Sequence, residues 1–408
     1  MAPAPQPLRA AWSAVLRRRH RLPPALDRAL EHAKWWFAAP PEDLQVAPAP
    51  AGAPPRVLIA PTGFAGQGRA WSEAMTQSGL ASGANWAFQA ATGRAFAYQA
   101  SYTVPISVNA APGAFQSAQF QRVVDSFQGA VLESGRPLFG RLFGYSPGRE
   151  ALALATLGLA VAVMWHGSDV RLPSEHARTH PLSPYALPQL RRRAAELEST
   201  ARRNRRAMSH LGLPQLVSTP DLLDQVKDAI WCPVVAQAGP APAGPALPGG
   251  IPKVVHAPSQ PLLKGTDLID PILRRLAQAG RIEYIRVEGV SAAEVRRLYA
   301  AADIVADQFR MGIYGVAAVE AMAAGRLVLS DVDQSTQRAV RQRTGLALPI
   351  MKVAAADLEA ALDQVAADPA PARALAAQGP AFAQAVHSGA RSARALLGAL
   401  GLAEPSAK

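Results

Sequence analysis

Short apolar runs alternate with longer amphipathic stretches over most of this 408-residue chain. In the first half, residues 56–75 predict a strand, a Gly-rich loop and a helix, and further apolar runs follow at residues 129–134, 159–165 and 214–220. Strands that are apolar throughout are typical of a parallel sheet that is covered by helices. The pattern therefore predicts repeated strand–helix units.

The same alternation returns in the second half of the chain. It predicts strands at 252–257, 282–289, 303–308 and 326–331, and helices at 265–280, 291–302 and 314–325, followed by helical segments. Between the halves, residues 236–250 (AQAGPAPAGPALPGG) consist almost entirely of Pro, Gly and Ala. Such a composition is typical of a linker.

These boundaries predict an α/β protein with two Rossmann-like domains that face each other across a cleft. The expected parts are a basic Pro/Ala-rich extension (1–55), a first domain (56–235), the linker (236–250), a second domain (251–390) and a C-terminal tail (391–408). Ligands of open parallel sheets usually bind in such a cleft.

The N-terminal extension contains one basic amphipathic stretch, residues 16–37, that ends in Trp35, Trp36 and Phe37. Two interpretations stay open: a flanking helix packed on the first domain, which the pattern favours, or a contact with an anionic membrane surface. The longest apolar run, residues 151–165, is too short to span a membrane and contains a glycine. It is expected to be a helix end followed by a buried strand.

A net charge of +12 and a pI of about 10.4 favour an anionic partner. Nucleotide-linked substrates and acidic lipids both qualify, whereas nucleic acid is not expected, because no recognised nucleic-acid module accompanies the charge. The single cysteine, Cys232, excludes an intrachain disulfide and a Cys-rich zinc site. With no secretory signal pattern, a cytoplasmic location is expected, and a peripheral position on the inner membrane face stays open.

The glycine-rich segment GFAGQG, residues 63–68, lies between a predicted strand and a predicted helix. Gly66 and Gly68 would let the backbone approach a ligand, and the helix end would offer unpaired N–H groups to a phosphate or a sugar oxygen. The full dinucleotide fingerprint is absent, so a plain tight turn is the alternative.

Polar residues follow the apolar strand at 159–165, where His166, Gly167, Ser168 and Asp169 come together. At the carboxyl end of a parallel strand they would face the cleft, where His166 or Asp169 can bind a sugar hydroxyl or take a proton. The alternative is a turn in which Ser168 or Asp169 caps the next element.

In the second domain, Lys264 lies at the start of a predicted helix, where an ammonium group can neutralise a diphosphate. The loop 312–315, with Tyr314 and Gly315, leads into an Ala-rich helix that carries Glu320. A buried carboxylate needs hydrogen bonds, and a ribose diol would supply two. The alternative partner for Glu320 is a nearby basic side chain such as Arg326.

Three segments carry a family resemblance. LYAAADIVADQ and YGVAAVEAMAAGRLVLSDV, both in 298–332, resemble the C-terminal signature of family 4 (group 1) glycosyltransferases, which have the GT-B architecture. HAPSQPLLKGTD (256–267) resembles the phosphate-binding loop of that family, and HGSDVR (166–171) resembles the end of a central strand in its N-terminal domain. The resemblance covers roughly residues 55–390 and is thinner in the first domain.

The resemblance implies a role for four residues. Glu320 would bind the nucleotide ribose, Lys264 would bind the donor diphosphate, Gly315 would present backbone N–H groups to the donor, and His166 would lie near the reacting sugar.

Two positions depart from the family pattern. The earlier glutamate of the paired-glutamate motif falls on Gly312, and an arginine that precedes the family lysine falls on Ser259. Arg310 could replace that arginine as a phosphate-binding cation.

The resulting hypothesis is a glycosyltransferase that moves a sugar from a nucleotide-diphosphate sugar to a glycan, lipid-linked or small-molecule acceptor. Retention at the anomeric carbon is implied by the resemblance. No metal is expected, since no paired acidic metal motif appears, and no cofactor is expected beyond the donor substrate. The alternatives are a catalytically silent nucleotide- or sugar-binding protein of the same fold and a nucleotide-sugar epimerase.

Overall fold

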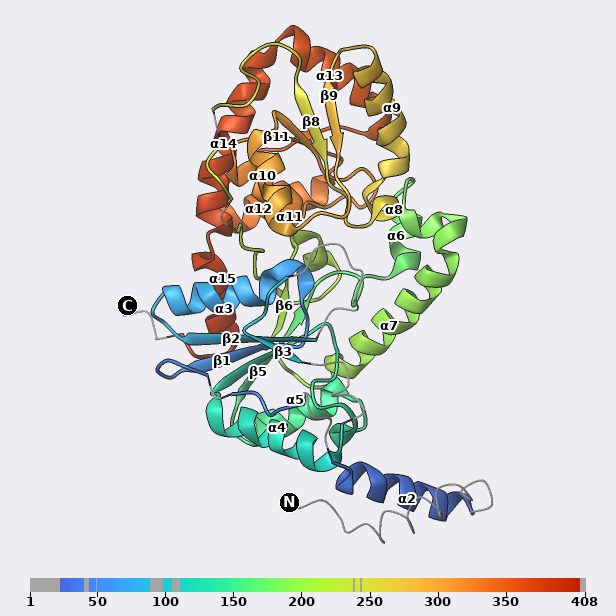
Figure 1. Cartoon of the computed structure of the whole chain (residues 1–408), viewed down its shortest axis with the longest axis vertical. Helices are drawn as coiled ribbons and strands as arrows, with labels where there is room; N and C mark the ends of the chain where they lie inside the picture. Colours follow the sequence, from blue (N-terminus) through green and yellow to red (C-terminus); the bar gives the residue numbers. More distant parts are fainter. Residues whose placement is uncertain are drawn as a thin grey trace.

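The computed structural model describes residues 23–39, 44–48, 50–88, 98–104, 111–237, 239–242 and 244–403. These residues form two α/β lobes that are stacked along the long axis of the molecule (Figure 1), each built on a parallel sheet. We call residues 23–237 with 388–403 the first lobe and residues 244–387 the second lobe. The predicted fold class, with two Rossmann-like domains, is confirmed.

The sheet of the first lobe has seven strands within the described residues. They are β1 (Arg56–Ala60), β2 (Ser82–Phe88), β3 (Tyr102–Val104), β4 (Gly129–Glu133), β5 (Ala160–Trp165), β6 (Gln215–Val217) and β7 (Ile230–Trp231). Their spatial order is β3-β2-β1-β4-β5-β6-β7, and every pair is parallel. The strand order therefore reverses between β1 and β4, where ligands bind in folds of this kind.

The second lobe repeats this arrangement with five strands in the described part of the chain. They are β8 (Lys253–His256), β9 (Glu283–Arg286), β10 (Ile304–Ala306), β11 (Leu327–Ser330) and β12 (Met351–Lys352). The spatial order is β12-β11-β10-β8-β9, so the reversal falls between β8 and β10.

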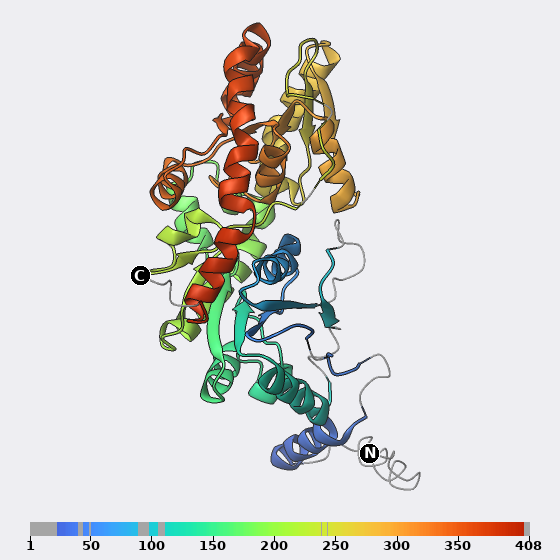
Figure 2. The same ribbon diagram turned by 90° about the vertical axis from the view of Figure 1, so that its left-hand side faces the viewer.

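Helices cover both sheets (Figures 1 and 2). In the first lobe they are α2 (Pro24–Phe37), α3 (Gln67–Gln77), α4 (Gly113–Ser126), α5 (Pro147–Thr156), α6 (Pro173–Thr179), α7 (Arg191–Ser209) and α15 (Ala390–Ala399), with short turns η2 (Phe64–Gly66), η4 (Gly140–Phe143), η5 (Pro184–Ala186), η6 (Pro188–Leu190) and η7 (Pro220–Asp224). In the second lobe they are α8 (Pro261–Lys264), α9 (Thr266–Gln278), α10 (Ala292–Ala301), α11 (Val316–Ala323), α12 (Gln334–Thr344), η8 (Ala355–Asp357), α13 (Leu358–Ala367) and α14 (Pro369–His387).

Local sequence explains where several of these elements begin. Ser146 and Ser291 precede α5 and α10, and each hydroxyl accepts the backbone N–H three residues later, as N-cap residues do. The apolar run 151–165 is, as predicted, the end of α5 followed by the buried strand β5. Strands β2, β3, β7 and β12 were not predicted, because they are short or contain few β-branched residues.

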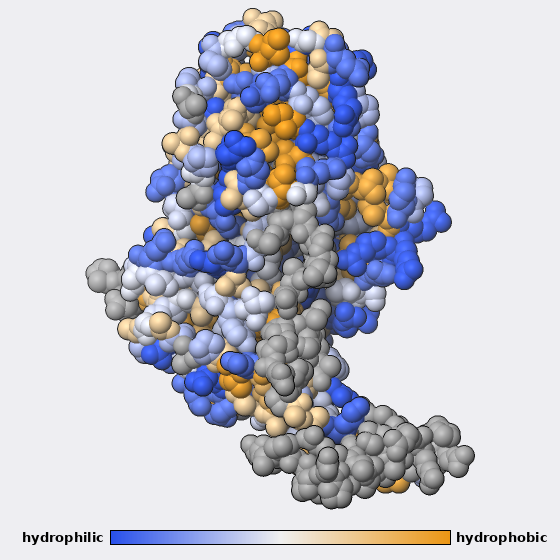
Figure 3. Space-filling model, in the orientation of Figure 1, coloured by the Kyte–Doolittle hydropathy of each residue, from blue (hydrophilic) through white to orange (hydrophobic). Residues whose placement is uncertain are grey.

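The amphipathic stretch of the N-terminal extension forms α2, which packs on α4 through Trp35, a residue only 7% exposed. Packing on the first domain, the favoured interpretation, is confirmed for the described part, and residues 16–22 lie outside it. No helix among the described residues combines the length and apolar character needed to cross a bilayer. On the face shown in Figure 3, hydrophilic side chains gather along α7, where the side chain of Arg192 is 94% exposed.

The expected C-terminal tail is wrong for its described part, residues 391–403. Helix α14 runs along the second lobe, and α15 then packs against α3 of the first lobe (Figure 2). Leu396 and Leu397 are fully buried in one core cluster with Ile59 and Trp71. The spacing of these leucines buries one face of α15, so the end of the chain completes the first lobe.

Candidate functional site

The two lobes meet at the carboxyl ends of their sheets. On the α6 side, Nη1 of Arg310 donates to the carbonyl of Leu182 at 3.0 Å, and Nε2 of His180 lies 2.6 Å from Oδ2 of Asp333. On the opposite side the chain crosses between the lobes twice, and the N–H of Ala236 donates to the carbonyl of His387 at 2.8 Å. The region enclosed by these contacts holds most of the residues that the sequence singled out.

His166 lies at the carboxyl end of β5, as predicted, with its side chain only 6% exposed. Its ring stacks on Phe64, with centroids 4.3 Å apart, and on the indole of Trp71 at 5.7 Å. Its Nε2 lies 3.0 Å from Oε1 of Glu133, the last residue of β4. The other carboxylate oxygen of Glu133 accepts the N–H of Thr62, two residues after the end of β1. Glu133, which sequence reasoning missed, therefore joins the ends of three neighbouring strands.

Asp169 is buried, and its carboxylate accepts the backbone N–H groups of His166 and Gly167, the latter at 2.8 Å. Both carboxylate oxygens are thus engaged by the two residues that precede Ser168, whereas the alternative, a side chain of this segment that caps the next element, is wrong, because α6 begins after Leu172 without a side-chain cap. A role for Asp169 in binding a sugar hydroxyl stays a prediction. Ser168 is exposed on the same turn, and Gly167 has a positive φ of 134°.

The glycine-rich loop forms the turn η2 and the start of α3. Gly66 has a φ of 71°, a left-handed conformation that favours glycine. A Cβ at Gly66 would approach Gln237 to 2.7 Å and Tyr98 to 2.9 Å, and one at Gly68 would clash with Asn85. These glycines therefore allow close packing within the protein. Whether a ligand also approaches them stays a prediction.

Lys264 lies at the end of α8, and its ammonium group forms an ion pair with Asp307, which follows β10. The lysine side chain is 14% exposed and that of Asp307 is fully buried. The geometry keeps the cation at the point where the strand order of the second sheet reverses. Asp307 is a second residue that sequence reasoning missed, although a polar residue directly after an apolar strand was the signal that had identified His166.

Arg310, offered as a substitute phosphate cation, is engaged elsewhere. Its Nη2 pairs with Oδ2 of Asp267 at 2.6 Å in addition to its contact with Leu182. Tyr314 is buried, with its hydroxyl 3.3 Å from Nε2 of His387. Both residues therefore fix the loop between β10 and α11, and direct roles in substrate binding stay predictions.

Glu320 lies on α11 and faces Arg296 of α10, with Oε1 and Nη1 3.4 Å apart. The alternative prediction, that Glu320 pairs with Arg326, is wrong. The guanidinium of Arg326 donates instead to the backbone carbonyls of Ala302, Ala324 and Gly244. Burial raises the pKa of Glu320 to about 7, against the lowering effect of Arg296. The weak contact leaves the carboxylate short of hydrogen-bond donors.

A cavity of about 640 Å³ opens beside Glu320, between linker residues 236–237 and 239–242 and helices α10, α11 and α14. Its polar lining comes from Gln237, Arg296, Glu320, Gln384, His387 and Ser388. Gly315 caps the start of α11, the helix that carries Glu320. The cavity thus combines one carboxylate, one guanidinium and several amide or hydroxyl groups, which can hydrogen-bond a polar ligand.

Lys264 at the end of α8 and Glu320 on α11 both belong to the second lobe. Burial raises the pKa of Tyr299, a fully buried residue of α10. The negative charges of Asp307 and Glu320 raise this pKa further. Tyr98, from the first lobe, has a pKa raised to about 12, first by burial and then by the charge of Glu320. The charges of Asp307 and Glu320 thus both act on Tyr299, and Tyr98 of the first lobe lies within the electrostatic reach of Glu320.

Buried polar atoms without a hydrogen-bond partner gather at this region. Of nine such side-chain atoms among the described residues, six belong to Thr62, His166, Ser218, Thr219, Asp221 and Asp307, at or just after the carboxyl ends of strands. Native proteins leave few buried polar groups unpaired, and those that remain commonly meet water or a ligand. No group of three or more His, Cys, Asp or Glu in the described part of the chain could hold a metal ion.

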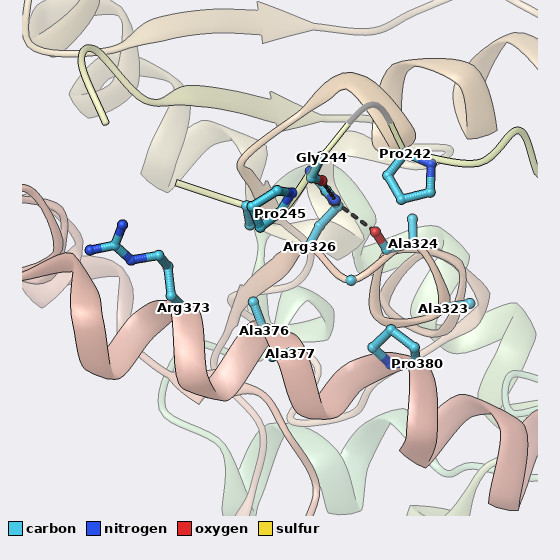
Figure 4. A pocket seen from close by; sticks show the side chains of 12 residues that line it. Pro242, Gly244, Pro245, Ala323, Ala324, Arg326, Arg373, Ala376, Ala377 and Pro380 are labelled. Atoms are coloured by element: carbon cyan, nitrogen blue, oxygen red, sulfur yellow. Dashed lines mark hydrogen bonds between the residues drawn. The ribbon is translucent and has the colours of Figure 1, made fainter. Parts of the chain in front are cut away.

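Figure 4 shows a second cavity, of about 500 Å³. It lies next to the first, because both are lined by Pro242, Ala323, Ala324 and Pro380. Alanines and prolines of α11, α14 and the linker form most of its wall, and the guanidinium of Arg326 is held by carbonyls of the wall itself. The guanidinium of Arg326 is therefore already hydrogen-bonded within the protein, and this cavity has fewer polar groups for a ligand than the cavity at Glu320.

No family model and no curated protein sequence matches the chain. Solved structures do match. Sucrose-phosphate synthase from Thermosynechococcus elongatus is similar with a TM-score of 0.50 and 15% identity, over 83% of this chain and 96% of that one. The glycosyltransferase SnogD from Streptomyces nogalater gives a TM-score of 0.41 at 15% identity, over 85% of this chain and 99% of that one.

The likeness to sucrose-phosphate synthase establishes the fold, which is the two-domain GT-B arrangement of glycosyltransferases. Sequence identity of 15% does not extend to substrates. The narrower resemblance to family 4 stays a prediction.

Proposed function

We propose that the chain is a glycosyltransferase that takes a sugar from a nucleotide-diphosphate sugar and delivers it to an acceptor. The observation that carries the proposal is the underbonded carboxylate of Glu320, which lines a cavity of about 640 Å³ in the lobe that also holds Lys264 at the reversal point of its sheet. A nucleotide sugar offers a ribose diol to a carboxylate and a diphosphate to an ammonium group.

The residues divide the work as follows. Glu320 accepts the ribose hydroxyls, and Lys264 with the N-terminus of α11 after Gly315 stabilises the negative charge of the departing diphosphate. The first lobe supplies His166 near the reacting sugar. This division requires neither a metal ion nor a cofactor, and we propose retention at the anomeric carbon on the family resemblance alone.

A second function has one observation in its favour. The position of the earlier family glutamate is Gly312, and the carboxylate of Asp333 fills the space where a side chain of residue 312 would begin. A chain without that carboxylate could bind nucleotide sugars without transferring them.

A thermal-shift screen with UDP, GDP, ADP, the corresponding monophosphates and their sugar conjugates tests the proposal, since a ligand that binds only the folded state raises the unfolding temperature. Stabilisation by one nucleotide family is expected. Incubation of that conjugate with candidate acceptors then separates transfer from silent binding. A chain that no nucleotide stabilises contradicts both functions.

A further inference from the structure

Asp307 has an unusual environment for an acidic residue. Its side chain is fully buried, and one carboxylate oxygen pairs with Lys264 while the other, Oδ2, has no hydrogen-bond partner among the described residues. Leaving a buried carboxylate oxygen unpaired is costly, so a group that donates to it would be bound favourably. The position, directly after β10 at the reversal of the second sheet, is where ligands of open parallel sheets bind.

The other carboxylates around this loop are already engaged. Asp267 pairs with Arg310 at 2.6 Å, and Asp333 lies 2.6 Å from His180. Glu320 faces Arg296 and lines the cavity. Among the described carboxylates of the second lobe, the buried oxygen without a hydrogen-bond partner is Oδ2 of Asp307.

Backbone geometry excludes a carboxylate from the next candidate position. Gly312 has a φ of 66°, and a Cβ built there would collide with the carboxylate of Asp333. A donor sugar that binds near this loop therefore finds no acceptor at residue 312. Asp307 is five residues earlier and presents its free oxygen beside the cation that would hold the diphosphate.

We propose that Asp307 binds the 2-hydroxyl of the donor sugar while Lys264 binds the adjoining phosphate. The inference rests on the proposed function. Without ligand, the two side chains neutralise each other, which limits the cost of burying both charges. A nucleotide sugar replaces this pairing, because its phosphate is on the anomeric carbon and its 2-hydroxyl is on the neighbouring carbon. One ligand thus supplies an anion for the ammonium group and a donor for Oδ2.

The experiment is isothermal titration calorimetry with UDP, UDP-glucose and UDP-2-deoxy-2-fluoroglucose, or the guanosine or adenosine equivalents if the screen selects another base. Fluorine cannot donate a hydrogen bond. The unaltered chain is expected to bind the fluoro analogue about tenfold more weakly than UDP-glucose, or about 1.4 kcal/mol. Asp307→Asn is expected to bind both conjugates alike, because its amide cannot offer the same two acceptors. It is expected to bind UDP at least as tightly as the unaltered chain, because Lys264 has lost its counter-ion.

Asp270→Asn is the matched control, since Asp270 is another largely buried carboxylate of the second lobe, paired with Arg274 at 2.7 Å. It is expected to keep the tenfold preference. Equal affinity of the unaltered chain for UDP-glucose and its fluoro analogue overturns the inference without any variant. A parallel loss of UDP and UDP-glucose binding in Asp307→Asn also overturns it, because that result indicates a structural role. If the unaltered chain binds no nucleotide at all, the proposed function fails and this inference with it.

Discussion

Oε1 of Glu133 lies 3.0 Å from Nε2 of His166 at the carboxyl ends of two adjacent strands, β4 and β5. Because a carboxylate can only accept, the proton of the imidazole is on Nε2, and Nδ1, which is buried without a partner, is left as an acceptor when the ring is neutral. Glu133 therefore sets which nitrogen of the neutral His166 ring carries the proton.

Glu133→Gln is expected to lower sugar transfer by on the order of 10²-fold, the lower end of what a positioned acid or base contributes. The amide can keep the hydrogen bond from Thr62, but its NH₂ group then faces His166 and favours the opposite tautomer. Urea unfolding should show a stability loss of only about 1 kcal/mol. Glu73→Gln, an exposed carboxylate on α3 paired with Arg69, is the control, and unchanged transfer by Glu133→Gln would show that the pair has no part in the reaction.

Lys264→Ala should slow transfer by about 2.7–4 kcal/mol in activation free energy, the range for the loss of one preorganised charge-stabilising group. The reason is that the departing diphosphate loses the ammonium group at the reversal point of the second sheet. Steady-state kinetics measure the effect. Lys253→Ala serves as the control, because that lysine pairs with Glu283 at the opposite, amino-terminal end of the sheet. Equal turnover in the two variants would remove Lys264 from the mechanism.

How much of this site the sequence predicted depends on the range of the contacts. His166 was identified because it directly follows a strand, Lys264 because it lies at a predicted helix start, and Glu320 because it is an acid on an otherwise apolar helix, all of which local patterns reveal. Glu133 and Arg296 were missed, because they become functional candidates only through partners 33 and 24 residues away. A strand's burial is visible in its own sequence, whereas pairing across strands is set by the topology of the whole sheet.

Glu320→Gln is expected to weaken nucleotide binding and to remove a pH dependence of stability. The pKa of Glu320 is raised from 4.5 to about 7, so the folded state binds more protons than the unfolded state between these values. Stability therefore falls as pH rises from about 4.5 to 7 and is constant above that range. Relative to the variant, the unaltered chain should lose on the order of 3 kcal/mol across this window.

Chemical denaturation at a series of pH values checks the expectation, with Glu294→Gln, an exposed carboxylate on α10, as the control. Nucleotide affinity of the unaltered chain should rise through pH 7 as the carboxylate forms, and that of Glu320→Gln should not. Calorimetry that finds the same affinity for both proteins at pH 8 would refute the ribose-binding role.

The last prediction concerns the part of the chain that the sequence assigned to a tail. Leu396 on α15 is fully buried in the core of the first lobe, and its truncation leaves a cavity between α15, α3 and the sheet. Leu396→Ala is therefore expected to destabilise the protein by about 2–5 kcal/mol, as measured by denaturant unfolding. Leu152→Ala on α5, where the leucine is 57% exposed, should change stability by no more than about 0.5 kcal/mol. If the two variants were equally stable, α15 would be a dispensable tail after all. The expected loss of stability would instead show that the first lobe needs α15 to complete its core. The chain must then cross from the second lobe back to the first after α14, so this second crossing is part of the stable fold.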